Sequence, residues 1–255
     1  MIKFFRKIRQ SLLSQGRFSN YLLYAIGEIL LVMIGILLAL QVNNWNNGRL
    51  DAAKEQLILQ NLQTDIKNNI NNLEEVSNSF GEAYRASAKL LEIIKNEGDI
   101  NPSEIETLMD DIINKTKSLD LITGANDEIF NTGSLHLIND PVLRKEISNW
   151  SYYFTDTEDD IVIYRDYLFD FFIPSLSDKV ILRNMSVPPF FEEDLDLQPI
   201  SKSNFKLDYE KTIRTAEFEN QLYNNTLNYM YVINSYKVFG NYLEETLALI
   251  ESNIK

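Results

Sequence analysis

The sequence predicts an all-α protein: an N-terminal transmembrane helix followed by an elongated helical bundle with long antiparallel, coiled-coil-like helices. Three observations support this prediction. Residues 21–40 form an apolar run of twenty residues with a single charge. Apolar residues recur every three or four positions across residues 59–94 and again across 222–254, which is the period of an amphipathic helix. Cysteine is absent, so packing without disulfides must hold the fold.

The charge distribution separates the head of the chain from the rest. The 255 residues carry 24 Lys and Arg against 37 Asp and Glu, a net charge of -13. Residues 1–42 nevertheless hold five basic residues and one acidic residue. The basic head suits a membrane surface, whereas the acidic remainder argues against a nucleic-acid partner. We therefore expect the lipid bilayer, and no nucleic acid, among the partners.

The apolar run predicts a membrane-spanning helix. At 1.5 Å per residue it is about 30 Å long, the thickness of the hydrocarbon core of a bilayer. Its one charge, Glu28, costs about 2.5–3.5 kcal/mol, whereas its thirteen Leu, Ile, Val and Met residues together contribute about 4–8 kcal/mol. Tyr21 and Trp45 lie near its two ends as interfacial anchors. The run is longer than the apolar region of a cleaved signal peptide, which favours a retained signal-anchor.

The basic residues also predict the orientation of the span. Five precede it, and only Arg49 and Lys54 follow within twenty residues. The side richer in Lys and Arg stays in the cytoplasm. We therefore expect a basic cytoplasmic head at residues 1–20, a transmembrane helix at 21–42 and an extracytoplasmic helical domain at 43–255.

Polar and small residues of the span share one helical face. Glu28, Gly35 and Ala39 are separated by seven and four residues, and Gly35 with Ala39 forms a small-x-x-x-small pair. This face predicts a contact with another membrane helix, either in a homo-oligomer or on a partner membrane protein. Two other interpretations stay open: a protonated, idle Glu28, and a carboxyl group coupled to proton or ion movement.

The helices after the span follow from periodicity and from start and stop signals. Asn101 and Asp140 each precede a proline and are expected to be N-caps, and Gly133 is expected to end a helical turn. The expected elements are a helix at 50–96, a short helix from 102 to about 117, a turn at 126–132, a helix from 141 to about 174 with the acidic run 156–160 as a candidate interruption, a proline-containing loop at 183–208, and a helix at 215–254. The last helix has the three-and-four spacing of a coiled-coil seam and is expected to pack along the helix at 50–96.

Few residues are candidates for chemistry. With no cysteine and one histidine, His136, the chain lacks thiolate and multi-histidine metal sites, and it has no Gly-rich phosphate loop. The acidic runs 156–160 and 192–196 lack the ligand spacing of an EF-hand loop, so we interpret them as solvated surface. The tyrosines of the last helix have seam spacing and are interpreted as core. The sequence therefore predicts no catalytic residue, no metal ligand and no cofactor.

Three stretches of the chain resemble a known family. They are the head and span, with Tyr21–Glu28 and Ile34–Asn46 as the most specific parts; Gly133–Ile138 together with Leu143–Ile147; and Glu217–Asn220. They resemble a bacterial family of uncharacterised single-span membrane proteins with a helical extracytoplasmic domain. With the orientation above, the resemblance implies a single-pass protein of the bacterial inner membrane with a periplasmic C-terminal domain. It assigns no catalytic residue.

Two classes of function are compatible with these features. We expect a membrane-anchored, non-catalytic scaffold, accessory or sensing protein whose periplasmic domain binds a protein or a ligand. The alternative is a membrane-anchored enzyme that acts at the outer face through clustered carboxylates. Convergent carboxylates in a deep pocket would favour the enzyme, and a filled bundle with an exposed apolar patch would favour the binding protein.

Overall fold

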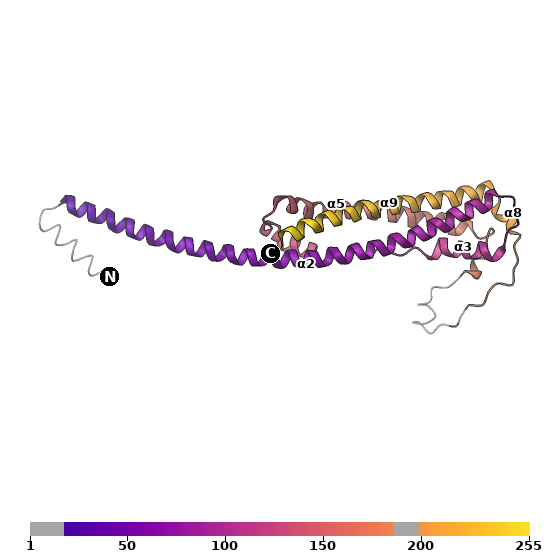
Figure 1. Cartoon of the computed structure of the whole chain (residues 1–255), viewed down its shortest axis with the longest axis horizontal. Helices are drawn as coiled ribbons and strands as arrows, with labels where there is room; N and C mark the ends of the chain where they lie inside the picture. Colours follow the sequence, from indigo (N-terminus) through magenta and orange to yellow (C-terminus); the bar gives the residue numbers. More distant parts are fainter. Residues whose placement is uncertain (1–17, 186–197, 199) are drawn as a thin grey trace. The chain divides into compact units, whose positions relative to one another are not determined.

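The computed structural model describes residues 18–185, 198 and 200–255 (Figure 1). The basic head through residue 17, the acidic run 192–196 and the side chain of Tyr21 lie outside what it describes. The chain divides into two compact units, Met1–Leu57 and Ile58–Lys255, and we treat each by itself.

The described residues form helices and contain no β-strand, which confirms the all-α class. In chain order the elements are α2 (Phe18–Lys95), α3 (Pro102–Asn114), α4 (Gly124–Thr132), η1 (Ser134–Leu137), α5 (Pro141–Asp166), η2 (Tyr167–Phe172), α6 (Ile173–Ser175), η3 (Leu182–Asn184), α8 (Tyr209–Ile213) and α9 (Ala216–Asn253). Element η2 is a π-helix, whereas η1 and η3 are short 3-10 turns.

The first unit contains the apolar part of α2. Its most apolar 18-residue window has a mean hydropathy of 2.5, and none of that window is buried. The helix continues through Asn43–Gly48, where the sequence indicated the end of the span. Asn and Gly lower helix propensity by only about 0.5–1 kcal/mol each and, unlike Pro, leave the backbone hydrogen bonds in place. A long apolar helix near the N-terminus is therefore present, by length and composition a candidate span.

In the second unit, α2 packs along α9. Lys67 pairs with Glu251 (2.8 Å), and the ring of Phe80 lies edge-on to that of Tyr236 with centroids 5.6 Å apart. Further along α2, the Ser87 hydroxyl is hydrogen-bonded to a threonine hydroxyl near the start of α9. Low residue numbers on α2 thus meet high numbers on α9, so the two helices run antiparallel (Figure 1).

Helix α5 covers another side of α9. The rings of Trp150 and Phe239 meet edge-on at 5.7 Å, and those of Tyr153 and Tyr242 stack at 4.2 Å. Asp140 at the start of α5 accepts a hydrogen bond from Asn253 at the end of α9 (3.0 Å), whereas Tyr167, just after α5, donates to the Gln221 carbonyl near the start of α9 (3.0 Å). This pair of helices is therefore also antiparallel, and α9 contacts both α2 and α5. Its buried residues are Phe218, Leu222, Asn225, Thr226, Tyr229, Val232, Ser235, Tyr236, Phe239, Tyr242, Leu243, Thr246 and Ile250.

Hydrogen bonds confirm the start and stop signals. Asn101 Oδ1 accepts from the Ser103 N–H (3.1 Å), and Asp140 Oδ1 accepts from the Val142 N–H (2.8 Å). Gly133 ends α4 with φ of 69°, a left-handed conformation that favours glycine because it has no Cβ.

Other boundaries differ from the sequence prediction. The helix expected to reach about residue 117 ends at Asn114, and the acidic run 156–160 does not interrupt α5. Within that run the buried Thr157 donates to the Tyr153 carbonyl (2.9 Å), while most of the carboxylates stay exposed. The run therefore stays helical, with Thr157 facing the core and most of its carboxylates facing solvent. The π-helix η2 was not predicted.

Leu243 provides a test of the α9 packing, because its side chain is fully buried. We expect Leu243→Asp to lower the free energy of unfolding by about 3–5 kcal/mol, since the new carboxylate would be buried without a partner. Urea unfolding of the full chain in mild detergent measures this loss.

The matched control is Asn241→Asp, which adds the same charge at an exposed position of α9. It should change the stability by less than about 0.5 kcal/mol. Equal midpoints for Leu243→Asp and the parent chain would show that the packing of α9 is assigned wrongly.

Candidate binding groove

A stripe of polar side chains runs along α2 within the second unit. Its members are three or four residues apart, so they lie on one helical face. All of them hydrogen-bond or form an ion pair with the chain that runs from the end of α3 to the first turn of α4. They are Asp65, Asn69, Asn72, Glu75 and Ser79.

Asn69 makes the most complete contact of this stripe. Its side chain is fully buried. Its Nδ2 donates to the carbonyl of Ile122 and its Oδ1 accepts from the N–H of the same residue, both at 2.8 Å. The side-chain amide therefore offers Ile122 one donor and one acceptor, as a neighbouring β-strand would.

The other members hold the same segment on either side of Ile122. Ser79 Oγ accepts from the Lys117 N–H (3.3 Å), and Glu75 forms an ion pair with the Lys117 ammonium (2.5 Å). Asp65 accepts from the Ala125 N–H (2.9 Å) and so supplies the side-chain cap that α4 lacks at its own N-cap residue. The ion pair is exposed and contributes little, so the backbone contacts are the main anchors.

These anchors show that residues 117–122 are extended. Their contacts on α2 lie at Ser79 and Asn69, ten residues apart, which is about 15 Å along a helix. Five residues of the segment cover this distance, about 3 Å per residue, close to the 3.3 Å rise of a β-strand. The segment therefore lies along α2 in an extended conformation.

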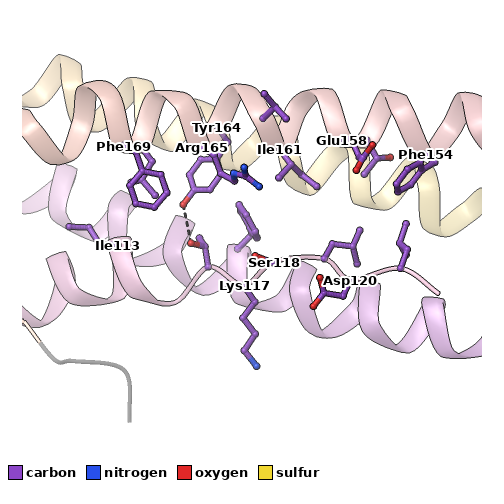
Figure 2. A pocket seen from close by; sticks show the side chains of 17 residues that line it. Ile113, Lys117, Ser118, Asp120, Phe154, Glu158, Ile161, Tyr164, Arg165 and Phe169 are labelled. Atoms are coloured by element: carbon purple, nitrogen blue, oxygen red, sulfur yellow. Dashed lines mark hydrogen bonds between the residues drawn. The ribbon is translucent and has the colours of Figure 1, made fainter. Parts of the chain in front are cut away.

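A groove lies between this extended segment and α5 (Figure 2). Its cavity is ≈ 390 Å³, within the range of ligand sites of about 300–1,000 Å³. Figure 2 shows Phe169 and Ile113 at one end and Phe154 and Glu158 at the other. The lining residues are Phe80, Ile113, Thr116, Lys117, Ser118, Leu119, Asp120, Leu121, Phe154, Thr157, Glu158, Ile161, Val162, Tyr164, Arg165, Leu168 and Phe169.

The floor of the groove is aromatic and uncharged. Tyr164 is buried, shares a hydrogen bond with the Thr116 hydroxyl (2.9 Å), and meets the ring of Phe80 edge-on at 5.1 Å. Burial raises the pKa of Tyr164 to about 12 and the pKa of its neighbour Tyr229 well above the usual value. The Tyr229 hydroxyl donates to the Ile112 carbonyl (2.6 Å). These hydroxyls are therefore neutral and held in place by hydrogen bonds at neutral pH.

Four charged side chains line the cavity: Lys117, which is paired with Glu75, and Asp120, Glu158 and Arg165. Within the described part of the chain, no hydrogen bond or ion pair reaches the side-chain charges of Asp120, Glu158 and Arg165. Glu158 and Arg165 are seven residues apart on α5, about 10 Å along the helix axis. The groove thus presents an unpaired cation and unpaired carboxylates at separated positions, which suits the binding of a ligand with both charges.

The arrangement shows no catalytic or metal-binding grouping. In residues 18–185 and 200–255, no three His, Cys, Asp or Glu side chains gather as possible cation ligands. His136 is exposed, and its Nδ1 donates to the Gly133 carbonyl at 2.8 Å. The groove has polar groups that can orient a ligand, but we find no nucleophile next to a base in its lining.

The site residues predicted from the sequence lie in the first unit. Glu28 is half-buried and borders a shallow hollow of α2, while Gly35 and Ala39 are exposed on the same helix. A Cβ added at Gly35 would meet nothing within 4 Å. Trp45 is 70% exposed, and the Tyr21 side chain lies outside the described residues. The roles of these residues in helix contact and interfacial anchoring stay predictions.

Sequence reasoning missed the groove and the polar stripe beneath it. A signal was present, because the five polar residues of α2 repeat at helical spacing beside the apolar stripe. Asparagines inside a long helix are poor helix formers and so point to a role in tertiary contact. No comparable sequence pattern marks the extended segment, residues 117–122.

Asn69→Ala tests the anchoring of the extended segment. The change removes both hydrogen bonds to Ile122, and we expect the free energy of unfolding to fall by about 1–3 kcal/mol. Hydrogen exchange should also become faster at the Ile122 amide. Asn72→Ala is the matched control, since it removes one longer, exposed bond to the Asp120 carbonyl (3.3 Å) and should cost less than about 1 kcal/mol. Equal effects of the two changes would contradict the anchoring role of Asn69.

Comparison with known proteins identifies a family but no activity. No curated protein and no solved structure matches the chain. A family model matches residues 28–177, more than half of the chain. The matched region contains the polar stripe of α2, the extended segment and all residues that line the groove. The chain belongs to this family, which is the family of unknown function DUF6090.

Proposed function

We propose that this protein is a membrane-anchored, non-catalytic accessory or sensing protein whose helical domain binds a ligand in the groove. One observation carries the anchoring. All thirteen large apolar side chains between residues 22 and 40 are exposed, from 49% for Leu30 to 77% for Leu23. In water such a surface is costly, at about 25 cal/mol for each Å² of apolar area, whereas hydrocarbon solvates it.

The basic residues support an orientation for this anchor. Five of them precede the span and two follow it closely, which supports a cytoplasmic N-terminus. The protein would then be a single-pass signal-anchor protein of the bacterial inner membrane, with residues 43–255 in the periplasm. The antiparallel contacts of α2 and α9 support an elongated, coiled-coil-like bundle as the scaffold of that domain.

The Glu28, Gly35 and Ala39 face supports association within the membrane. The open surface at Gly35 would let a second helix approach closely, and a carboxyl group in hydrocarbon favours a hydrogen-bonding partner. The partner would be a second copy of the chain or the span of another membrane protein. Tyr21 and Trp45 would anchor the two ends of the span at the interfaces.

No specific observation favours the alternative of an outer-face enzyme with clustered carboxylates. The two carboxylates that line the groove, Asp120 and Glu158, are accompanied by Arg165 and by an aromatic floor. A mixed lining of this kind is typical of binding sites, which combine apolar walls with a few polar groups that orient the ligand.

The topology can be measured with reporters fused after Lys255. A reporter active only after export should be active, and a reporter active only in the cytoplasm should be silent. Leu30→Arg combined with Leu37→Arg should release the chain from alkaline-washed membranes, because two central arginines cost about 5–7 kcal/mol. Leu57→Arg with Leu50→Arg, beyond the apolar run, is the control and should stay membrane-bound. Cytoplasmic reporter activity would contradict the orientation.

Association of the span can be measured by crosslinking. The chain has no cysteine, so single engineered cysteines in the span report proximity in native membranes without background. Gly35→Ile should weaken crosslinking more than Glu28→Leu if close packing dominates, and less if the hydrogen bond dominates. Close packing and the hydrogen bond together are expected to change association by about tenfold, since intramembrane hydrogen bonds alone average about 0.6 kcal/mol, about threefold, and seldom exceed 2 kcal/mol.

Ile36→Leu, which alters a neighbouring side chain on another face without changing its volume, is the control. If neither Gly35→Ile nor Glu28→Leu alters the crosslinks, or if no crosslink forms, the span is an anchor alone.

A further inference from the structure

We infer that the groove binds a short extended peptide, which pairs as a strand with residues 118–122 and carries a basic group and a carboxylate about three residues apart. The inference rests on the proposed binding role of the helical domain and is independent of the membrane span. It follows from the free edge of the extended segment and from the unpaired charges of the cavity.

The extended segment has one occupied edge and one open edge. On the occupied edge, the Asp120 carbonyl and both backbone groups of Ile122 bond to side chains of α2. In extended backbone, consecutive residues direct their N–H and C=O groups to opposite edges. The Lys117 N–H also bonds to α2, through Ser79, so this alternation begins after residue 117 and applies to residues 118–122. The polar backbone groups of Leu119 and Leu121 therefore lie on the edge away from α2. Among the described residues no hydrogen bond reaches them.

This open edge borders the cavity. Leu119 and Leu121 line it, their side chains are partly buried against the core, and α5 forms the opposite wall (Figure 2). Unpaired strand edges are templates for the addition of another strand, and peptide-binding domains use such edges for affinity. Here α5 stands where the next strand would lie, so the groove has room for one strand and not for a growing sheet.

The unpaired charges of the cavity determine which charged groups a bound peptide must carry. The Arg165 guanidinium is suited to a carboxylate, which it can bind through two parallel hydrogen bonds. Glu158 and Asp120 lie toward the Phe154 end and are suited to an ammonium or guanidinium group. The separation of about 10 Å between Arg165 and Glu158 corresponds to about three residues of an extended peptide.

The test is calorimetric titration of the full chain in mild detergent. The probe is acetyl-Lys-Val-Thr-Val with a free C-terminal carboxylate, which places its charges at the required separation. Three further probes carry a single N-methyl group on the amide of the second, third or fourth residue. Strand pairing requires alternation: the second and fourth positions should behave alike, and opposite to the third. Methylation of an amide that faces the segment should weaken binding by about tenfold.

Two variants of α5 test whether binding requires the charge of the ligand. Arg165→Gln should weaken binding of the carboxylate probe by about tenfold and leave binding of its C-terminal amide analogue unchanged. The matched control, Lys145→Gln, removes a cation from an exposed position of α5 outside the cavity and should change neither. Hydrogen exchange at the Leu119 and Leu121 amides should slow when the probe is bound.

The outcomes separate this inference from the proposed function. Alternation in the N-methyl series together with slowed exchange supports strand pairing. A flat N-methyl series, or no binding of the peptide, overturns it. Decanoate, an amphipathic carboxylate without amides, is titrated in parallel. Binding of decanoate that depends on Arg165, with no binding of the peptide, would overturn the peptide inference and keep the binding role of the groove. Binding of neither probe would contradict both.

Discussion

The two hydrogen bonds between Asn69 and the backbone of Ile122 are the interaction on which the groove depends. An extended segment that lies on a helix cannot pair with the helix backbone, because those groups bond within the helix. Side chains must therefore supply hydrogen-bond partners for the backbone of the segment, and the polar stripe of α2 supplies them along one edge. Because α2 satisfies only that edge, the other remains open beside α5. The same contacts that hold the segment in place create the surface that we propose for binding.

The groove floor is rigid because it belongs to the main core. Phe80 of α2 meets three tyrosine rings edge-on or nearly so: Tyr164 of α5 and Tyr229 and Tyr236 of α9, with centroids 5.1–6.0 Å apart. Burial keeps these hydroxyls neutral. Hydrogen bonds fix the Tyr164 and Tyr229 rings, whereas the buried Tyr236 hydroxyl has no partner among the described residues and its ring is held by packing. A ligand in the groove would thus contact side chains whose positions are set by all three long helices.

The functional proposals draw on two separate parts of the molecule. The apolar part of α2 carries exposed Leu, Ile, Val and Met residues that hydrocarbon solvates well, and this supports the anchor. The groove carries unpaired charges above an aromatic floor, and this supports binding in place of catalysis. Membership of the family of unknown function DUF6090 covers both parts without assigning a role to either.

Most of the helices could be predicted from the sequence, because helical periodicity, the caps at Asn101 and Asp140 and the left-handed Gly133 are local signals. The sequence also determined the apolar run of the candidate span, whose length and composition need no tertiary contact. The conformation of residues 117–122, in contrast, depends on tertiary contacts. That segment has no periodicity of its own, and its main anchor lies 53 residues earlier in the chain. Pairing over such a distance depends on how α2 and α5 pack, so the groove and its open edge emerge only once the helices are in place.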